Sequence, residues 1–287
     1  MVCCAALCCV ASSPVLDGFL AEAKESFSQA TLIAIDAALQ AGEVLRQGFG
    51  TRFSISSKEG THNLVTEYDH KSEKLIIDFI RSHFPRSKFL AEESGETGEA
   101  DEWVWIIDPL DGTVNFAHEI PLFSVSIAAE RKGEVVSGVV YAPITNELFV
   151  AEKGKGAFLN GRPIAVTSLH DIKGAILATG FPYNLAENPL HCIDHFVDIL
   201  HLGIPIRRLG SAAIDLAYVA SGRFDAFFEV SLAPWDSAAG ILLIAEAGGK
   251  TTHWDQKPYS LRKKEPILSS NGCIHAELAK ILSRSIP

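Results

Sequence analysis

The stretch that decides the fold is WVWIIDPLDGT, residues 103–113. Its first five residues are apolar and predict a buried strand, and two carboxylates follow at the end of that strand. The proline between the carboxylates fixes one backbone dihedral, and the glycine after them frees another, as a tight loop requires. We therefore expect Asp108 and Asp111 to converge on one point, with the carbonyl oxygen of Leu110 facing it.

The chemistry of this loop favours a metal site. Two carboxylates and a carbonyl are hard oxygen ligands, which suit Mg²⁺ better than Zn²⁺. Thr113 lies where a helix or turn can begin, and the N–H groups there are available to hold an anion. The alternative is an ordinary surface turn, because Asp-Pro-x-Asp-Gly is a common turn sequence. The buried strand that leads to both carboxylates favours the site.

Three further acidic positions have similar settings. Glu92 follows a predicted strand over 88–91, and the alternative there is a solvated acidic loop that continues to Glu99. Asp236 precedes an apolar helix, and taken alone it is predicted to be an N-cap stabilised by the helix dipole. Asp69, in a polar stretch, could equally be an N-cap.

Composition bounds the class of protein and its partners. The chain has 287 residues, 47% hydrophobic and 21% charged, and 25 Lys+Arg against 35 Asp+Glu give a formal charge of −10. This balance is typical of a soluble globular protein that is long enough to fold without disulfides or metal. Because binding to phosphate backbones and anionic membranes needs a basic surplus, we expect neither a nucleic-acid nor a membrane partner.

Cysteine usage indicates the compartment. Two of the six cysteines, Cys192 and Cys273, are scattered in the body of the chain, which is no disulfide framework and favours a reducing, cytoplasmic location. The other four lie within residues 1–16, which we interpret as a disordered extension that lacks the basic residues of a signal peptide. Acylation of these cysteines, or capture of a metal by their thiols, is the alternative.

The pattern of the chain predicts a mixed α-β protein. A largely antiparallel half flanked by helices precedes a half in which strands and helices alternate, and the pattern changes near Gly174. Asn160-Gly161 is a strong hairpin signal. Strands are predicted near 53–56, 88–91, 103–107, 122–129, 135–141, 147–151, 175–179 and 224–229. Helices are predicted over 17–48 (one or two), from Asp69 to Pro85, and over 190–202, 211–220, 236–247 and 274–282.

Three motifs together resemble the inositol monophosphatase family. DPLDGTVNF (108–116) resembles its first signature, and WDSAAG (235–240), with EAGG (246–249) at the end of the same helix, resembles its second. LAEES (90–94) resembles its acidic metal-binding loop. The similarity runs from about Asp17 to the C-terminus. It implies a layered α-β-α-β-α sugar-phosphatase fold, as one domain over 17–287 with two tightly packed halves, about 17–173 and 174–287.

The resemblance also implies the site residues. Asp69 and Thr113 form the pair that helps to activate the nucleophilic water, with Glu92 also catalytic, and Lys58 stands near a basic residue of the family's flexible loop. The implied Mg²⁺ ligands are Glu92, Asp108, the Leu110 carbonyl, Asp111 and Asp236. The implied substrate-binding residues are Asp111, Gly112, Thr113, Gly210, Ser211, Ala212, Glu229 and Asp236.

The implied activity is hydrolysis of a phosphorylated polyol. Carboxylate-held Mg²⁺ ions can activate water and stabilise the leaving alkoxide, so no covalent intermediate is needed. The first hypothesis is an inositol-1-monophosphatase, which resemblance further suggests to be a homodimer. Phosphatases for other sugar phosphates, histidinol phosphate, fructose 1,6-bisphosphate, NADP or 3′-phosphoadenosine compounds are alternatives. Glu229, seven residues before Asp236, favours a polyol because its carboxylate would repel a second phosphate.

A regulatory protein-binding role is the alternative from a different class. Some bacterial members of the family also bind transcription or ribosome-assembly machinery. The intact set of acidic residues argues against a purely non-catalytic protein, and the net charge argues against direct RNA binding. A protein partner remains open.

Overall fold

The computed structural model describes residues 14–57, 64–99 and 102–284. Helix α1 (Pro14–Ser26) begins inside the last residues of the predicted N-terminal extension, whose first 13 residues lie outside the described part of the chain, as does Lys58. Within the described ranges, no helix combines the length and apolar character needed to cross a membrane.

An eight-stranded sheet forms the first half of the molecule, in the order β10-β9-β8-β7-β6-β5-β3-β4. Neighbours pair antiparallel, except that β3 and β5 are parallel. The strands are β3 (Lys88–Ala91), β4 (Gly95–Thr97), β5 (Trp103–Asp111), β6 (Ser124–Arg131), β7 (Glu134–Ala142), β8 (Glu147–Glu152), β9 (Gly156–Leu159) and β10 (Arg162–Ile164).

A five-stranded sheet forms the second half, in the order β12-β11-β13-β15-β14. β11 is parallel to both of its neighbours, and β15 is antiparallel to both of its own. The strands are β11 (Leu177–Thr179), β12 (Ile206–Arg207), β13 (Ala226–Glu229), β14 (Lys250–Thr252) and β15 (Ile267–Ser270). A separate antiparallel pair joins β1 (Ile55–Ser57) to β2 (Leu64–Thr66).

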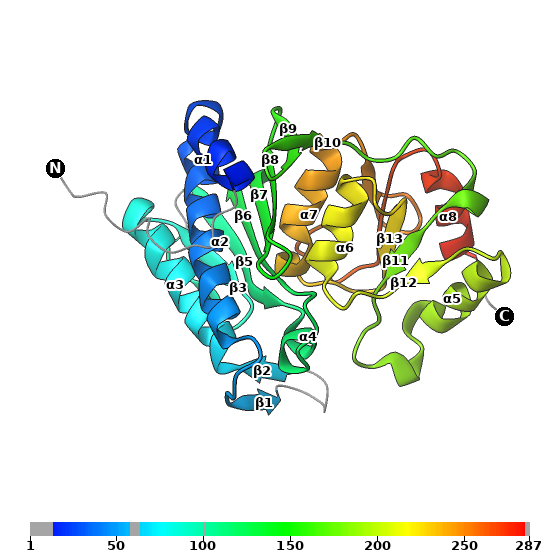
Figure 1. Ribbon diagram of the computed structural model, residues 1–287. Helices are drawn as coiled ribbons and strands as arrows, with labels where there is room; N and C mark the ends of the chain where they lie inside the picture. Colours follow the sequence, from blue (N-terminus) through cyan, green and yellow to red (C-terminus); the bar gives the residue numbers. More distant parts are fainter. Residues whose placement is uncertain (1–13, 58–63, 100–101, 285–287) are drawn as a thin grey trace.

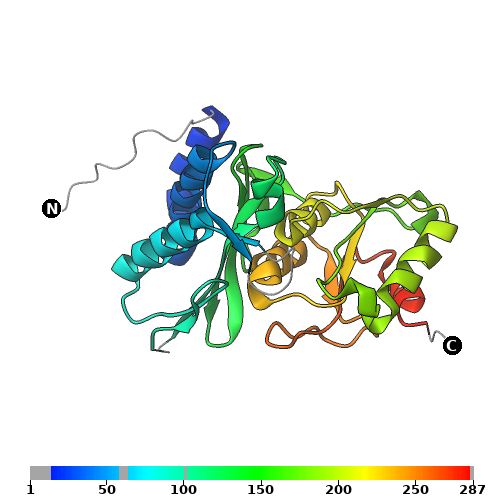
Figure 2. The same ribbon diagram turned by 90° about the horizontal axis from the view of Figure 1, so that it is seen from below.

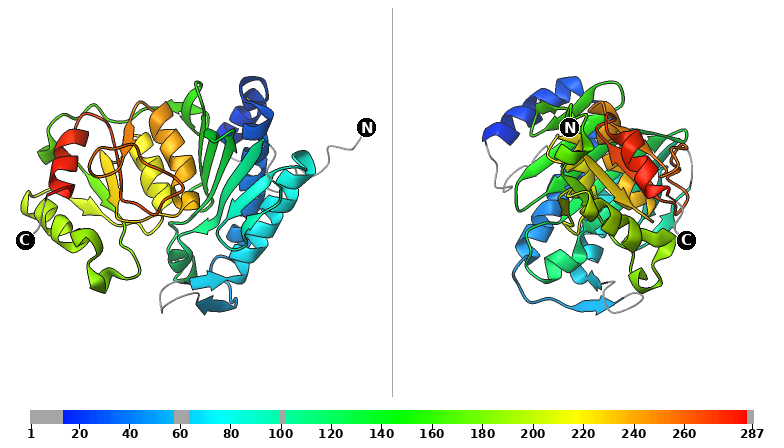
Figure 3. Two further views of the ribbon diagram at one scale, coloured as in Figure 1. Left: turned by 180° about the vertical axis from the view of Figure 1, so that it is seen from behind. Right: turned by 90° about the vertical axis from the view of Figure 1, so that its right-hand side faces the viewer.

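The helices cover both sheets in layers (Figure 1). α1, α2 (Gln29–Gly48) and α3 (Glu67–His83) cover the outer face of the large sheet. α6 (Ala212–Ala220) and α7 (Pro234–Glu246) lie between the two sheets, as Figure 2 shows from below. α5 (Cys192–His201) and α8 (His275–Leu282) cover the far face of the small sheet (Figure 3). The predicted α-β-α-β-α layering is confirmed.

The central strand shows how the sequence produces these layers. Along β5, Trp105 and Ile107 enter the core beneath α1–α3, whereas Ile106 enters the core beneath α6 and α7. Alternate residues of a strand point to opposite faces, so a sheet covered by helices on both sides needs continuous apolar strands. The apolar run in residues 103–107 therefore supplies side chains to the cores on both faces of the large sheet.

Small residues explain how closely α7 approaches its neighbours. A Cβ on Gly138 of β7 would lie 2.8 Å from the carbonyl oxygen of Ala239, and a Cβ on Gly240 would lie 2.5 Å from the Cβ of Leu216 in α6. The run Ser237-Ala238-Ala239-Gly240 therefore serves packing between the large sheet and α6. At the end of α7, Glu246 accepts hydrogen bonds from the N–H groups of Gly154 and Gly156, each at 2.8 Å.

Several predicted elements are confirmed and others were wrong in detail. The Asn160-Gly161 hairpin is confirmed, because Leu159 of β9 pairs with Arg162 of β10. The alternative interpretation of residues 92–99 as an acidic loop was wrong in part, because they contain strand β4. Strands β2, β12, β14 and β15 were not predicted. The first long helical segment is two helices, α1 and α2, separated at Ser28, the N-cap of α2. Its predicted end at Gly48 is confirmed.

Candidate active site

The predicted acidic residues meet at one edge of the large sheet. Glu92 follows β3, and Asp108 and Asp111 lie at the end of β5. Because β3 and β5 are parallel neighbours, their carboxyl ends reach the same edge, and the Glu92 N–H donates to the carbonyl of Ile107 at 3.2 Å. The parallel pair therefore brings two separate motifs together.

The regular pairing of β5 with β6 is interrupted at Asp108 and Asp111, the two carboxylates at its end. The register with β6 shifts between Asp108 and Asp111, as in a β-bulge. Asp108 Oδ1 accepts a hydrogen bond from the Leu110 N–H at 3.0 Å, and Ser72 of α3 donates to the carbonyl of Pro109 at 2.8 Å. These bonds hold the loop, so both acidic side chains have fixed positions.

Asp69 and Thr113 are hydrogen-bonded, as the predicted catalytic pair requires. Thr113 Oγ1 lies 3.0 Å from Asp69 Oδ1 and 3.0 Å from the carbonyl oxygen of Leu110, and its single proton can serve one acceptor at a time. Asp69 Oδ2 accepts from the Thr66 N–H at 2.7 Å and from the Thr66 hydroxyl at 2.6 Å. Burial is the main reason why the pKa of Asp69 is raised.

Asp69 and Asp236 share one helix position, and it is not the N-cap. The N-caps of α3 and α7 are Thr66 and Ala233, so each aspartate is the third helical residue and accepts from the N–H of its N-cap residue. The N-cap interpretation was therefore wrong by three residues for both. In each case one carboxylate oxygen anchors the helix start and the second oxygen is left for other partners.

Asp111 is joined to the start of α6. Its Oδ2 accepts from the Ser211 hydroxyl at 2.5 Å and from the Ala213 N–H at 2.7 Å. Burial nevertheless raises the pKa of Asp111 to about 6, against the opposing effect of these donors. The contact brings Ser211 and Ala212, both predicted to bind substrate, beside the end of β5.

Two glycines allow the chain to close around this point. Gly112 has φ 96° and Gly210 has φ 85°, in the left-handed region that favours glycine. A Cβ on Gly112 would lie 3.0 Å from the carbonyl oxygen of Leu122 and 3.2 Å from that of Gly210. Asn115 joins the two segments, since its Nδ2 donates to the carbonyls of Leu122 at 2.6 Å and Leu209 at 2.8 Å.

The acidic side chains are buried against one another. The pKa of Asp108 is raised well above its usual range, first by burial and then by Glu92, Asp111 and Asp236. The pKa of Asp236 is raised by burial and then by Asp111 and Glu92. Within the described part of the chain, no basic side chain offsets the charge of Asp108, Asp111 or Asp236. Buried like charges of this kind are suited to bind a metal cation.

The donor set fits hydrated Mg²⁺ rather than a closed protein cage. No three His, Cys, Asp or Glu side chains of the described residues form a ready-made metal cage. Mg²⁺ usually keeps several waters and binds through one or two carboxylates, so it does not need such a cage. Asp108 and Asp111, both at the end of β5, are the pair of carboxylates that such a hydrated ion needs.

Glu229 borders the cluster from the second sheet. It is the last residue of β13 and is 8% exposed. Burial, followed by the charge of Asp111, raises the pKa of Glu229 to about 8, while Arg208 acts in the opposite direction. Both halves of the molecule therefore contribute to the site.

Sequence reasoning missed two buried acids next to the site. Glu73 of α3 accepts a hydrogen bond from the Glu93 N–H at 2.8 Å and so holds the loop after β3. Asp215 of α6 is 2% exposed, its Oδ1 has no hydrogen-bond partner among the described residues, and burial raises its pKa. Each lies four residues after a predicted site residue, Asp69 or Ser211, on the same helix face. That spacing was the available signal.

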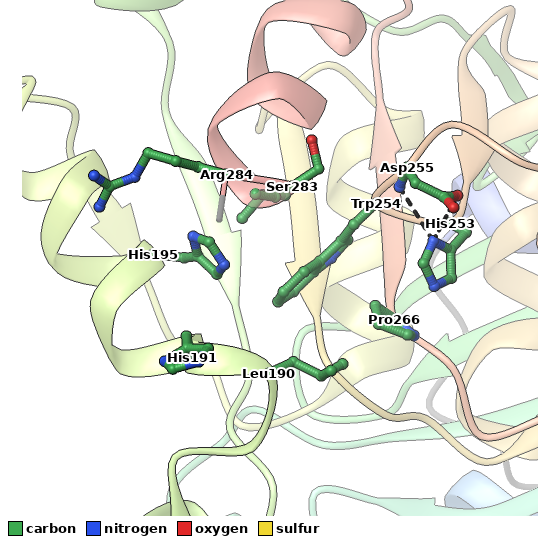
Figure 4. Close-up of a pocket in the computed structure, with 10 residues that line it drawn as sticks. Leu190, His191, His195, His253, Trp254, Asp255, Pro266, Ser283 and Arg284 are labelled. Carbon is green, nitrogen blue, oxygen red and sulfur yellow. Dashed lines mark hydrogen bonds and ion pairs between the residues drawn. The ribbon is translucent and has the colours of Figure 1, made fainter. Parts of the chain in front are cut away.

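A pocket of about 360 Å³ on the outer face contains none of the predicted site residues (Figure 4). Its charged groups pair within the chain: Arg284 binds Asp198 at 2.5 Å, and His253 lies 2.8 Å from Asp255. We therefore assign the candidate site to the acidic cluster. The pocket is lined by Leu190, His191, His195, His253, Trp254, Asp255, Pro266, Leu282, Ser283 and Arg284.

Comparisons with known proteins cover nearly the whole described chain. The family described as "Inositol monophosphatase family" matches residues 27–286. "Nus factor SuhB" of Escherichia coli (strain K12) is 46% identical over 219 residues, which are 76% of this chain and 82% of that protein. "Inositol-1-monophosphatase" of Caulobacter vibrioides is 43% identical over 256 residues, 86% of this chain and 98% of that protein.

Solved structures agree with the fold. The extragenic suppressor protein suhB from Bartonella henselae has a TM-score of 0.85 at 40% identity and covers 90% of this chain and 100% of its own. An "IMPase/NADP phosphatase complexed with Mg2+ and phosphate" has a TM-score of 0.75 at 26% identity, covering 86% of this chain and 92% of its own.

Proposed function

The chain belongs to the inositol monophosphatase family of Mg²⁺-dependent phosphatases, and we propose that it hydrolyses inositol 1-phosphate to inositol and phosphate. The observation that carries this proposal is the burial of Asp108 against Glu92, Asp111 and Asp236, beside the Asp69–Thr113 hydrogen bond at 3.0 Å. Relatives named inositol-1-monophosphatase support the substrate.

In this proposal the acidic cluster holds the metal. The ligands are Glu92, Asp108, the Leu110 carbonyl, Asp111 and Asp236. When bound, Mg²⁺ lowers the pKa of water and offsets negative charge on the phosphate and on the leaving oxygen. The bulge in β5 and the first turn of α7 hold the carboxylates in place before any ligand arrives.

Thr113 and Asp69 handle the proton of the attacking water. The Thr113 hydroxyl donates to Asp69 Oδ1, which leaves the lone pairs of Thr113 Oγ1 free to accept a hydrogen bond from water. As water attacks phosphorus, its proton passes to this pair, and the Thr66 donors keep Asp69 oriented. Glu92 completes the catalytic set because it borders Asp108 at the end of the neighbouring strand.

Substrate contacts come from both halves of the molecule. The backbone N–H groups of Gly112 and Thr113 face the phosphate, and Asp111 and Asp236 border it. The polyol lies against Glu229. With the charge of Asp111 offset by bound metal, the Glu229 carboxylate would be ionised, accept hydrogen bonds from hydroxyl groups and repel a second phosphate. Gly210, Ser211 and Ala212 line the same side.

A substrate panel with Mg²⁺ tests this function. Phosphate release is measured from inositol 1-phosphate, fructose 1,6-bisphosphate, histidinol phosphate, NADP and 3′-phosphoadenosine 5′-phosphate, with and without excess chelator. We expect the highest kcat/KM for inositol 1-phosphate, and no phosphate release from any ester in excess chelator. Brisk turnover of another ester beside negligible turnover of inositol 1-phosphate contradicts the substrate assignment.

A second role in regulation is favoured by the names of other relatives. Several proteins 46% identical to this chain are named "Nus factor SuhB". The acidic charge of −10 makes a protein partner more suitable than RNA. Affinity capture from native lysate, with the Asp108→Asn variant as a second bait, tests this role, and recovery of no specific partner counts against it.

We also propose a homodimer of single-domain subunits over residues 17–287. The hydrophobic core beneath α6 and α7 supports a single domain, because it joins Ile106 and Val140 of the large sheet to Phe227 and Ile267 of the small sheet. Light scattering of the purified protein measures the subunit number. Limited proteolysis near residue 173 tests the domain, and separate stable halves contradict it. The cytoplasmic location stays a prediction.

A further inference from the structure

Gly180 stands directly against the carboxylate of Glu229. It follows β11, and Thr179 of β11 pairs in parallel with Phe228 of β13, so the next residues of both strands are neighbours. A Cβ on Gly180 would lie 2.1 Å from Glu229 Oε2, 2.6 Å from Cδ and 2.8 Å from Oε1. The whole carboxylate therefore occupies the space that any other side chain at position 180 would need.

Backbone geometry does not explain this glycine. Gly180 is not among the residues with positive φ, unlike Gly112 or Gly210 at the same site. Its φ is therefore not one that favours glycine over alanine. The close approach of Glu229 is thus the observation that accounts for a glycine at this position.

The position of the Glu229 carboxylate depends on this space. Among the described residues no hydrogen bond fixes the carboxylate, and its charged neighbours include Arg208 and the acids Asp111, Asp215 and Asp236. A contact below 3 Å with two oxygens and the carbon between them cannot be relieved without moving the group. A methyl group on Gly180 therefore displaces the carboxylate from its place beside the acidic cluster.

We propose that Gly180 is a specificity-determining residue, whose missing side chain lets Glu229 present its carboxylate to the hydroxyl groups of a polyol monophosphate. The inference rests on the proposed function, because it assigns the polyol side of the same site. Its physical basis is steric. Gly180 itself contacts Glu229 and needs no contact with the phosphate or the metal.

The test compares two esters in wild type and in Gly180→Ala. Inositol 1-phosphate carries the hydroxyl groups that Glu229 would bind, whereas p-nitrophenyl phosphate carries none. We expect the KM for inositol 1-phosphate to rise about 10-fold, as for the loss of a charge-assisted hydrogen bond, and kcat/KM for p-nitrophenyl phosphate to change less than about 2-fold. An equal loss for both esters overturns the proposal.

A matched glycine controls for the substitution itself. Gly174 ends the short helix η1 (Ile172–Gly174), also has no positive φ, and a Cβ there would meet the side chain of Leu169 at an ordinary 3.4 Å. Gly174→Ala is expected to leave both esters unchanged. A Gly174→Ala enzyme that loses selectivity as Gly180→Ala does also overturns the proposal.

A double-mutant cycle isolates the contact. In the Glu229→Ala background the carboxylate is gone, so Gly180→Ala should neither raise the KM further nor lower the melting temperature. In the wild-type background Gly180→Ala should lower the melting temperature by several degrees. Equal shifts in both backgrounds show that Gly180 acts without Glu229 and overturn the proposal.

The cycle also separates this inference from the proposed function. If the wild type hydrolyses none of the esters, the proposed function and the specificity role are both wrong, and the melting temperatures still decide the steric contact. If the wild type hydrolyses inositol 1-phosphate and Gly180→Ala does not change its preference over p-nitrophenyl phosphate, only the inference on Gly180 is wrong.

Discussion

Two groups of acidic side chains in this molecule have opposite surroundings. Asp255 lies in the outer loop, which joins β14 to β15 (residues 253–266). It accepts a hydrogen bond from Lys257 Nζ at 2.6 Å and lies 2.8 Å from the His253 ring. The hydrogen bonds from Lys257 are the main reason why the pKa of Asp255 falls to about 2. At the candidate site, burial raises the pKa of Asp111 to about 6 and that of Glu229 to about 8. Asp255 is paired with cationic side chains of its own loop, whereas Asp111 and Glu229 are buried close to other acids, the setting that the proposed Mg²⁺ site needs.

Replacing one acid in each region should give the largest difference in activity. Asp108→Asn should lower kcat/KM for inositol 1-phosphate by about 10³-fold or more, because a neutral amide is a poor Mg²⁺ ligand. Asp255→Asn, the matched control on the outer loop, should change it by less than about 2-fold. Steady-state phosphate release measures both, and circular dichroism checks the fold. Near-normal turnover by Asp108→Asn refutes its role in metal binding.

A second exchange separates the proton pair from the metal ligands. Thr113→Ala should lower kcat about 10²-fold, the usual scale for loss of a general acid–base contact, with little change in the Mg²⁺ concentration that gives half-maximal activity. Asp236→Asn should instead abolish turnover at every Mg²⁺ concentration. Mg²⁺ titrations of both variants make the distinction. A large shift in Mg²⁺ dependence for Thr113→Ala would place this residue with the ligands.

Acid sensitivity of unfolding should come partly from the second half. His275 is 1% exposed. Its Nε2 lies 2.8 Å from the Thr252 hydroxyl and its Nδ1 lies 2.8 Å from the Ser270 hydroxyl. Burial lowers the pKa of His275 to about 4. The unfolded state then binds more protons between pH 6.5 and 4, so stability falls as pH decreases through that window, by at most about 3 kcal/mol. Urea unfolding at several pH values measures it.

His275→Gln provides the control for this pH effect. Without the imidazole, the fall in the urea midpoint between pH 6.5 and 4 should become shallower, while activity at neutral pH stays within about 2-fold of wild type. An unchanged slope in the variant shows that other groups, such as the acids of the site, carry the acid sensitivity.

The smallest expected effect concerns stability without metal. Asp108 is buried beside three like charges, so Asp108→Asn should raise the melting temperature of the metal-free protein by about 2–4 °C, the shift that corresponds to about 1 kcal/mol. Asp255→Asn removes contacts to Lys257 and His253 and should not raise it. Thermal scans in chelator compare the two, and a drop for Asp108→Asn contradicts mutual repulsion in the cluster.

The large sheet could be predicted from sequence and the small sheet only in part. Strands β5 to β8 are six to nine residues long and mostly buried, so their apolar runs stand out. β12, β14 and β15 have two to four residues each. β15 pairs with β13, which ends 38 residues earlier, so no local pattern reveals it. Short strands with distant partners are fixed by tertiary packing.

The same limit applies to the site. The acidic motifs were visible because each follows an apolar strand or opens an apolar helix. The helix position of Asp236 was missed because aspartate also suits the third helical residue, although Pro234 at the first turn marks the true start. Asp215 and Gly180 depend on partners from other elements, Asp111 and Glu229, that only the folded chain brings near.

The most direct test of the central claim is phosphate release from inositol 1-phosphate as a function of Mg²⁺ concentration, for wild type and Asp236→Asn. The account predicts that wild-type turnover is absent in excess chelator and rises to saturation with Mg²⁺, while Asp236→Asn stays inactive at every concentration and remains folded. Wild-type turnover that persists in chelator, or an Asp236→Asn titration that matches wild type, would contradict the assignment of the buried acidic cluster as the metal centre.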